Sequence, residues 1–181
     1  MSVFSNAVGT ARENADAYKR ALLDLLGDRD PVAVFAELPD AIAEQTAFLS
    51  DEDARRPERE GKWSILQVIQ HLIDSEIVYG FRTRLILSNP GVEIAGYDQD
   101  RWADVLRYQH ESLVDALPEL RALRGRNLRL LTRLTDEELD RFGMHNERGR
   151  ESIRDMVRLL AGHDLLHRAQ IARIRSTLGF F

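Results

Sequence analysis

The spacing of apolar residues predicts a chain that is helical almost throughout. In several long segments apolar side chains recur every three or four residues, which gathers them on one face of an α-helix. Glycine and proline are scarce inside these segments, and the alternating β-branched runs that would mark strands are nearly absent. Long helices are therefore expected over residues 8–26, 31–49, 64–88 and 152–178.

Residues at the expected helix ends agree with these ranges. The hydroxyl of Ser64 can accept a hydrogen bond from a backbone N–H in the first turn of its helix, and Ser152 with Asp155 forms a capping box. Pro31 fits the first turn of the second helix. Pro39, near the middle of that helix, predicts a kink or a split.

A further helical segment begins at Trp102. One of its faces repeats every seven residues, at Leu106, Leu113, Leu120 and Leu134, with Asn127 in the missing place. Such a repeat is typical of a helix packed in a bundle. Pro118 interrupts the segment and predicts either a kink or two successive helices.

The remaining segments are expected to connect these helices. Residues 51–62 form a charged connector, residues 91–100 and 142–150 contain glycines and are expected to be loops, and a short helical turn begins at Thr135. The whole pattern predicts an all-α four-helix bundle with additional short helices, which forms a single domain over residues 1–181.

The composition is that of an ordinary globular protein, with 44% hydrophobic and 30% charged residues. No run approaches the roughly 20 apolar residues of a membrane-spanning helix, and the N-terminus lacks the pattern of a secretory signal, so a cytoplasmic protein is expected. The chain has no cysteine, which excludes disulfides, thiolate ligands and cysteine nucleophiles. Phosphate-binding glycine loops and the G-x-S-x-G nucleophile motif are absent from the sequence as well.

The distribution of charge bears on the choice of partner. The net charge of -5 argues against nucleic acid as the main partner. Residues 121–181, however, contain 13 arginines against 8 acidic residues. The pattern favours solvated outer faces of helices for these arginines. The open alternative is a basic surface that attracts an anionic ligand or nucleic acid.

Two histidines of the last helix are candidate metal ligands. His163 and His167 lie four residues apart, so both rings project from one helix face. The same stripe carries the apolar residues Met156, Leu160, Ile171, Ile174 and Leu178. The rings are therefore expected to point into the core, where they could bind one metal ion or would each need hydrogen-bond partners.

His71 can supply a third nitrogen from another helix. It lies among Val68, Leu72, Ser75 and Val78, where that helix turns inward. Three neutral imidazoles would leave one coordination position open for water or substrate, as in catalytic zinc sites. An H-x-x-x-H pair is a weak signal by itself, because core or surface histidines explain it as well. Spacing alone leaves both alternatives open.

Three segments carry a more specific pattern. They are GKWSILQVIQHLIDSE (61–76), YDQDRW (97–102) and GHDLLHRAQIARIR (162–175). The pattern resembles the DinB-like superfamily, which includes the YfiT-type proteins that are named as metal-dependent hydrolases. The resemblance implies a four-helix bundle that holds a metal through three histidines. By that motif the ligands are His71, His163 and His167.

The resemblance also implies a cofactor, an activity and an assembly. The ion would be zinc or nickel, with iron or manganese as alternatives that an imidazole-rich site does not exclude. The protein would be a metal-dependent hydrolase, or a transferase that uses a low-molecular-weight thiol, and would act on a small molecule. Family members are often homodimers. The alternative is a non-enzymatic binding protein of the stress or DNA-damage response, with a structural or vestigial metal site.

Nearby polar residues are candidates for supporting roles. Glu76 could act as a general base toward water at the metal or be a carboxylate of the bundle surface. Asp74 could accept the second N–H of a ligating histidine or pair with an arginine. Asp164 directly follows His163 and is expected to point away from the histidine face, and Gln170 could contact the water at the metal.

Aromatic residues and two further histidines complete the candidates. Trp63 is expected to anchor the start of its helix in the core. Tyr97 and Trp102 flank a loop that contains glycine, where they line the mouth of a pocket or cover the core. His110 and His145 have no partner at ligand spacing and are expected at the surface, with His145 in a loop.

Overall fold

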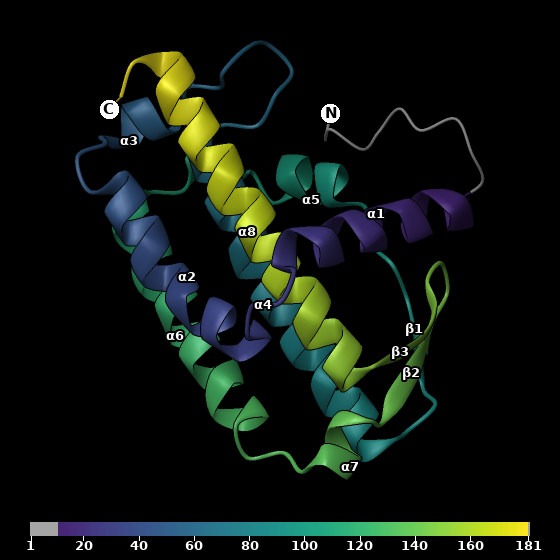
Figure 1. Ribbon diagram of the computed structural model, residues 1–181. Helices are drawn as coiled ribbons and strands as arrows, with labels where there is room; N and C mark the ends of the chain where they lie inside the picture. Colours follow the sequence, from purple (N-terminus) through teal and green to yellow (C-terminus); the bar gives the residue numbers. More distant parts are fainter. Residues whose placement is uncertain (1–10, 181) are drawn as a thin grey trace.

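The described part of the chain folds into long helices, short helical turns and one small sheet (Figure 1). The computed structural model describes residues 11–180, with side chains from residue 15 onward. The long helices are α1 (Ala11–Leu26), α2 (Pro31–Thr46), α4 (Ile65–Ser88), α6 (Leu113–Leu131) and α8 (Ile153–Leu178). The short ones are α3 (Asp51–Ala54), α5 (Gln99–Val105), α7 (Asp136–Leu139) and the 3-10 helix η1 (Tyr108–His110). The expected helical fold is confirmed, and the predicted start of the first helix at residue 8 lies outside the described residues.

Four of the long helices form the bundle, and α1 lies across it. α2 packs against α6 and α8, and α4 packs against the same two helices. The bundle helices together fill the main core, in which Leu38, Ile69, Leu120 and Ile171 are fully buried. α1 crosses the outside of α8 (Figure 1). Among the described residues, no helix has the length and the apolar character needed to cross a membrane.

The expected capping residues begin their helices. Ser64 Oγ accepts a hydrogen bond from the backbone N–H of Gln67 at 3.3 Å, and the Gln67 side chain accepts one from the backbone N–H of Ser64 at 2.9 Å. Ser152 and Asp155 form a second capping box at the start of α8. Pro39 lies inside α2, which remains one helix and ends at Thr46 rather than at residue 49.

The segment 102–134 is divided between successive helices, which is one of the two predicted arrangements, but the break does not lie at Pro118. α5 ends at Val105, Arg107 has a left-handed backbone with a φ of 58°, and α6 begins only after its cap, Ser112. The interruption therefore falls before Pro118, which lies inside α6. A left-handed residue such as Arg107 cannot continue a right-handed helix, so the chain changes direction there.

The seven-residue repeat is buried only where α6 carries it. Leu113, Leu120 and Asn127 are buried, as the repeat predicts. Leu106 follows α5 and is exposed, whereas Leu134 follows α6 and packs, partly buried, against a second apolar cluster. The repeat thus extends beyond α6 at both ends, and only its positions within α6 belong to the bundle.

Two segments that were expected to be loops contribute to a three-stranded sheet. The strands β1 (Glu93–Ile94), β2 (Phe142–His145) and β3 (Gly149–Ser152) lie in the order β1-β2-β3, with β1 parallel and β3 antiparallel to β2. Gly149 has a φ of 74°, a conformation that glycine adopts readily in hairpin turns. The charged connector 51–62 likewise contains the short capped helix α3.

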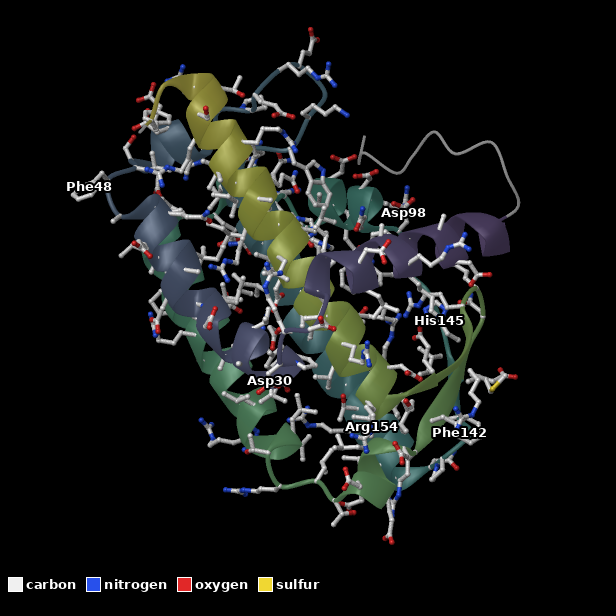
Figure 2. All side chains as sticks on the ribbon, viewed as in Figure 1. Asp30, Phe48, Asp98, Phe142, His145 and Arg154 are labelled. Carbon is white, nitrogen blue, oxygen red and sulfur yellow. The ribbon has the colours of Figure 1, made fainter. Side chains whose placement is uncertain are left out.

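His145 is buried, so the expectation that it lies at the surface is wrong. It ends β2, and its Nδ1 accepts hydrogen bonds from the backbone N–H groups of Glu147 at 3.2 Å and Arg148 at 3.4 Å. Burial lowers the pKa of His145 to about 4, so the ring is neutral at pH 7, as an accepting Nδ1 requires. The imidazole therefore closes the hairpin turn, on the side of the hairpin that faces the rest of the molecule (Figure 2).

The contact between α1 and α8 leaves no room for a side chain at Gly162. A Cβ atom placed there would lie 2.2 Å from the backbone oxygen of Leu22. Gly162→Ala is therefore expected to push the two helices apart and to lower the free energy of unfolding by about 1–3 kcal/mol, the usual cost of overpacking. Denaturant unfolding followed by circular dichroism measures the change.

Gly125→Ala is the matched control for this substitution. Gly125 lies in α6, where the nearest atom to an added Cβ is Arg129 Nη1 at 3.4 Å. Because alanine favours the helix, this variant is expected to keep the stability of the wild type or to gain up to about 1 kcal/mol. An equal loss of stability in both variants would contradict the close approach of α1 to α8.

Candidate metal centre

Three histidines from two helices meet in the bundle. His71 comes from α4, and His163 and His167 come from α8. The Nε2 atoms of His71 and His163 are 2.9 Å apart, and those of His163 and His167 are 3.1 Å apart. All three residues are buried, and one ligand atom from each lies within 4.8 Å of the others. The structure thus brings together the three residues that the sequence pattern singled out.

The apolar stripe of α8 explains why its two rings point inward. The stripe is buried along its length, at Met156, Leu160, Ile171 and Ile174. His163 and His167 lie on this face because residues three and four apart share one side of a helix. On α4, the buried Val68, Leu72 and Ser75 surround His71 in the same way. Burial of the two apolar faces therefore carries the imidazoles into the interior.

The three imidazoles are neutral at pH 7. Burial lowers the pKa of His71 and of His163 well below the ordinary value, and it lowers the pKa of His167 to about 4. The nearby histidines add to the effect for His71 and His163, because neighbouring positive charges would repel one another. Neutral imidazole is the form in which histidine binds a metal ion.

The hydrogen-bonding state of the rings fits a metal ligand set. The buried Nδ1 atoms of His71 and His163 have no hydrogen-bond partner in the part of the chain that the structure describes. Three Nε2 atoms face one another, although a neutral imidazole carries a single N–H. Nitrogen ligands about 2.0–2.1 Å from a tetrahedral zinc ion are about 3.3 Å from one another. The observed separations of 2.9 and 3.1 Å are close to this value.

Gln170 orients one of the three rings. Its Oε1 lies 2.8 Å from His167 Nδ1, one turn further along α8. An oxygen acceptor in this position favours the tautomer with the proton on Nδ1, which leaves Nε2 free as a ligand atom. Gln170 thus contacts the histidine itself, whereas the predicted contact with water at the metal stays a prediction.

Asp74 takes neither of its predicted roles. Its carboxylate accepts a hydrogen bond from the hydroxyl of Tyr108 in η1. Burial raises the pKa of Asp74, and the tyrosine hydrogen bond opposes this rise. Among the described residues, Asp74 forms no ion pair with an arginine. His110, at the end of η1, is exposed as predicted.

Glu76 is neither a general base at the histidines nor a surface carboxylate. It is buried, and its Oε1 lies 2.8 Å from Arg124 Nη2, while its Oε2 accepts a hydrogen bond from Asn127 Nδ2 at 3.0 Å. Both partners come from α6. Glu76 therefore faces α6, whereas the cavity beside His71 lies on another side of α4.

Arg124 joins Glu76 to Asp164 in a buried charge cluster. Arg124 Nη1 lies 2.5 Å from Asp164 Oδ2, and the guanidinium stacks 3.7 Å from the ring centroid of Phe35. Asp164 points away from the histidines, as predicted, while Arg124 is an exception to the expected solvated arginines. One guanidinium thus pairs with two carboxylates. Burial raises the pKa of Asp164, and it raises the pKa of Glu76 to about 7. Arg124 and Asn127 on the buried face of α6 were the sequence signal for this cluster.

A cavity of about 110 Å³ opens beside the histidines. His71 and His163 line it together with Ser75, Tyr79, Arg82 and Tyr97. Trp102 packs against Tyr97 with ring centroids 4.4 Å apart. Of the two predicted arrangements, Tyr97 therefore lines the pocket, and Trp102 packs against Tyr97 without lining the pocket itself.

Trp63 covers another side of the histidine cluster. Its ring centroid lies 5.2 Å from that of His71, and the side chain also packs against the main core. The predicted anchoring role is confirmed, and the contact with His71 adds to it. An aromatic neighbour excludes water and lowers the local dielectric constant, which strengthens electrostatic interactions at the cluster.

The fold and the histidine cluster define the family of the protein. Residues 35–171, which include all three histidines, match the family model of the DinB superfamily. The chain belongs to this superfamily.

Individual relatives agree with this assignment. A protein of Oceanobacillus iheyensis named "Putative metal-dependent hydrolase OB0413" is 31% identical over 133 residues, which are 72% of this chain and 75% of the relative. A Bacillus cereus protein named "Putative metal-dependent hydrolase" is 27% identical over 164 residues, which are 90% of this chain and 93% of the relative. The solved structure of YfiT from Bacillus subtilis, described as an unusual four-helix bundle topology, matches with a TM-score of 0.77. It is 23% identical and the match covers 98% of this chain and 94% of that one, which confirms the fold.

The raised pKa of Glu76 makes the stability of the protein depend on pH. The pKa of Glu76 is about 7 in the folded protein, against an ordinary value of 4.5. Protonated Glu76 therefore stabilises the folded state below pH 4.5, and this stabilisation is lost as the pH rises from 4.5 to 7. Glu76→Gln removes the ionisable group and is expected to reduce the decrease in the free energy of unfolding with rising pH. Between pH 5 and 7.5 the free energy of unfolding should decline by about 1–3 kcal/mol less than in the wild type.

Glu119→Gln provides the control for this experiment. Glu119 is an exposed carboxylate of α6, outside the Arg124 cluster. Urea unfolding at each pH is expected to give curves for Glu119→Gln that run parallel to those of the wild type. If Glu76→Gln also runs parallel to the wild type, Glu76 is ionised in the folded protein throughout this range.

Proposed function

We propose that the protein is a metal-dependent hydrolase whose divalent ion is bound by His71, His163 and His167. The observation that carries the proposal is the convergence of three buried, neutral imidazoles, with Nε2 separations of 2.9 and 3.1 Å, beside an open cavity. Zinc or nickel suits this all-nitrogen set best, and iron or manganese remain within its chemistry. The names of the relatives as metal-dependent hydrolases support the same conclusion.

The residues around the histidines would orient a ligand, exclude water and leave space for a substrate. A divalent ion at this centre would act as a Lewis acid and make water a stronger nucleophile near neutral pH. Gln170 fixes the tautomer of His167, and Trp63 keeps water from one side of the cluster. The cavity beside His71 and His163 offers room for a small molecule. Hydrolysis of such a molecule is the proposed reaction.

Transfer of a low-molecular-weight thiol is the second reaction that this centre would support. The chain has no cysteine, so the thiol would have to enter the cavity as a cosubstrate. A softer sulfur ligand also suits zinc and nickel centres. Assays of the metal-loaded protein with ester and amide substrates, with and without an added thiol, separate the two reactions.

Replacing one ligand is expected to remove the metal. His71→Ala and His167→Ala should each lose most of the bound zinc or nickel, because two imidazoles hold a divalent ion much less tightly than three. Metal content is measured by inductively coupled plasma mass spectrometry after dialysis, and turnover is measured on the same samples. His110→Ala is the control, since this exposed histidine lies outside the cluster and should retain the metal content and activity of the wild type.

The outcomes separate binding from catalysis. If the wild type and both ligand variants hold equally little metal after loading, the proposed centre does not exist. If the wild type holds one ion per chain and shows no turnover on any substrate, the ion has a structural role and the hydrolase proposal fails.

Gln170 offers a second test through the orientation of a ligand. Gln170→Ala removes the partner of His167 Nδ1 and is expected to weaken metal binding by roughly 10–100-fold, as loss of such partners commonly does. Gln170→Glu keeps an acceptor oxygen at the same reach and should restore the affinity. Competition with a chromogenic chelator measures both constants, and equal affinities in all three proteins would show that His167 needs no partner.

A further inference from the structure

The cavity beside the histidines has a cationic end, which Arg82 provides. An α-helix turns by about 100° per residue, so the eleven residues from His71 to Arg82 bring the two side chains within about 20° of one another around the axis of α4. Ser75 and Tyr79 lie between them and line the same cavity. Side chains of a helix lean toward its N-terminus, so the guanidinium extends back along α4 in the direction of the histidines.

The charge of Arg82 is buried and has no acidic partner. The side chain is 5% exposed, and no carboxylate of the described residues lies within ion-pair distance of it. Its Nη2 donates one hydrogen bond, 2.6 Å long, to the backbone oxygen of Ala95. The guanidinium also lies 5.6 Å from the ring centroid of Tyr79. Burial lowers the pKa of Arg82, as expected for a cation that has lost water without gaining a counter-ion.

The other buried arginine among the described residues and the second arginine that lines the cavity both have acidic partners. Arg124 is held by two buried carboxylates. Arg148, which lines the same cavity as Arg82, forms a bidentate pair with the fully buried Glu151, with bonds of 2.6 and 2.9 Å. Glu147 also lines the cavity, and it is exposed in the hairpin turn. Of the two arginines that line this cavity, Arg82 is therefore the one without an ion-pair partner among the described residues.

We propose that the cavity binds its substrate through an oxyanion, a carboxylate or a phosphate, that pairs with Arg82 while the rest of the molecule extends toward the three histidines. The planar guanidinium presents N–H groups in a fixed fork that matches an oxyanion. Tyr79 and Tyr97 add a phenolic lining that tolerates both the anion and an apolar body. The substrate role rests on the proposed function, whereas the anion-binding role of Arg82 does not depend on a metal.

Nuclear magnetic resonance of the metal-free protein tests the anion site directly. The labelled protein, of 20.7 kDa, is titrated with sodium acetate and separately with inorganic phosphate at constant ionic strength. Saturable shifts are expected for the Arg82 Nε–H group and for the backbone amides of residues 95–97. Acetamide, which has nearly the shape of acetate without its charge, should produce no such shifts. The tighter of the two anions identifies the chemical class of the oxyanion.

Variants of Arg82 establish that this residue is responsible. Arg82→Gln removes the charge and is expected to weaken binding of the preferred anion at least tenfold. Arg82→Lys keeps a charge without the fork, so it should retain part of the affinity and also fold if the neutral variant does not. Arg126→Gln removes an equal charge from the exposed face of α6 and should bind as the wild type does.

Each outcome decides between the two proposals. Saturable shifts that persist unchanged in Arg82→Gln, or a wild type that shows none with either anion, would overturn the anion site. Because the titration uses metal-free protein, loss of the metal proposal would leave this result standing. Conversely, an unchanged zinc content in a folded Arg82→Gln protein, together with lost anion binding, shows that the two sites are separate.

Discussion

The guanidinium of Arg124 is the contact on which the arrangement of the two histidine helices depends. It reaches from α6 to Glu76 of α4 at 2.8 Å and to Asp164 of α8 at 2.5 Å, and it stacks on Phe35 of α2. All four bundle helices therefore meet at one buried cation. Since Asp164 is the neighbour of His163 in the sequence, the position of this carboxylate also sets the height at which His163 enters the cluster.

A buried charge cluster of this kind contributes more to specificity than to stability. Desolvation of three ionisable groups offsets much of their attraction, and apolar replacements of such clusters are often equally stable. A different relative position of α4 and α8, however, would leave Glu76 or Asp164 buried without Arg124, which is strongly unfavourable. The histidine cluster adds a second polar layer between the same helices, at His71 and His163. Two polar layers in an apolar core therefore favour the alignment of α4 with α8 in which both layers are paired.

The long helices and their caps were predictable because their signals lie within a few residues of each other in the sequence. The sheet and the turn at Arg107 depend on tertiary contacts. Ser64 and Ser152 cap their helices through residues three positions away, so the sequence contains the whole signal. The sheet was not predictable in the same way, because β1 pairs with β2 about fifty residues later in the chain, and the short strands β2 and β3 have little local pattern. The hairpin turn did carry a signal in Gly149. The left-handed backbone of Arg107 had no such signal in the sequence, because tertiary contacts impose this conformation on an arginine.

Helical geometry also separates the acidic residues of α4 from the candidate site. Five residues correspond to about 140° around the axis, so Glu76 cannot share the face of His71, and it meets α6 instead. Asp74 lies nearer in angle, but Tyr108 occupies its carboxylate. One face of α4 therefore carries the charge that aligns the bundle, and another carries His71 and Arg82 toward the cavity. Both acids of α4 are thus engaged away from the histidines, Glu76 by Arg124 and Asp74 by Tyr108.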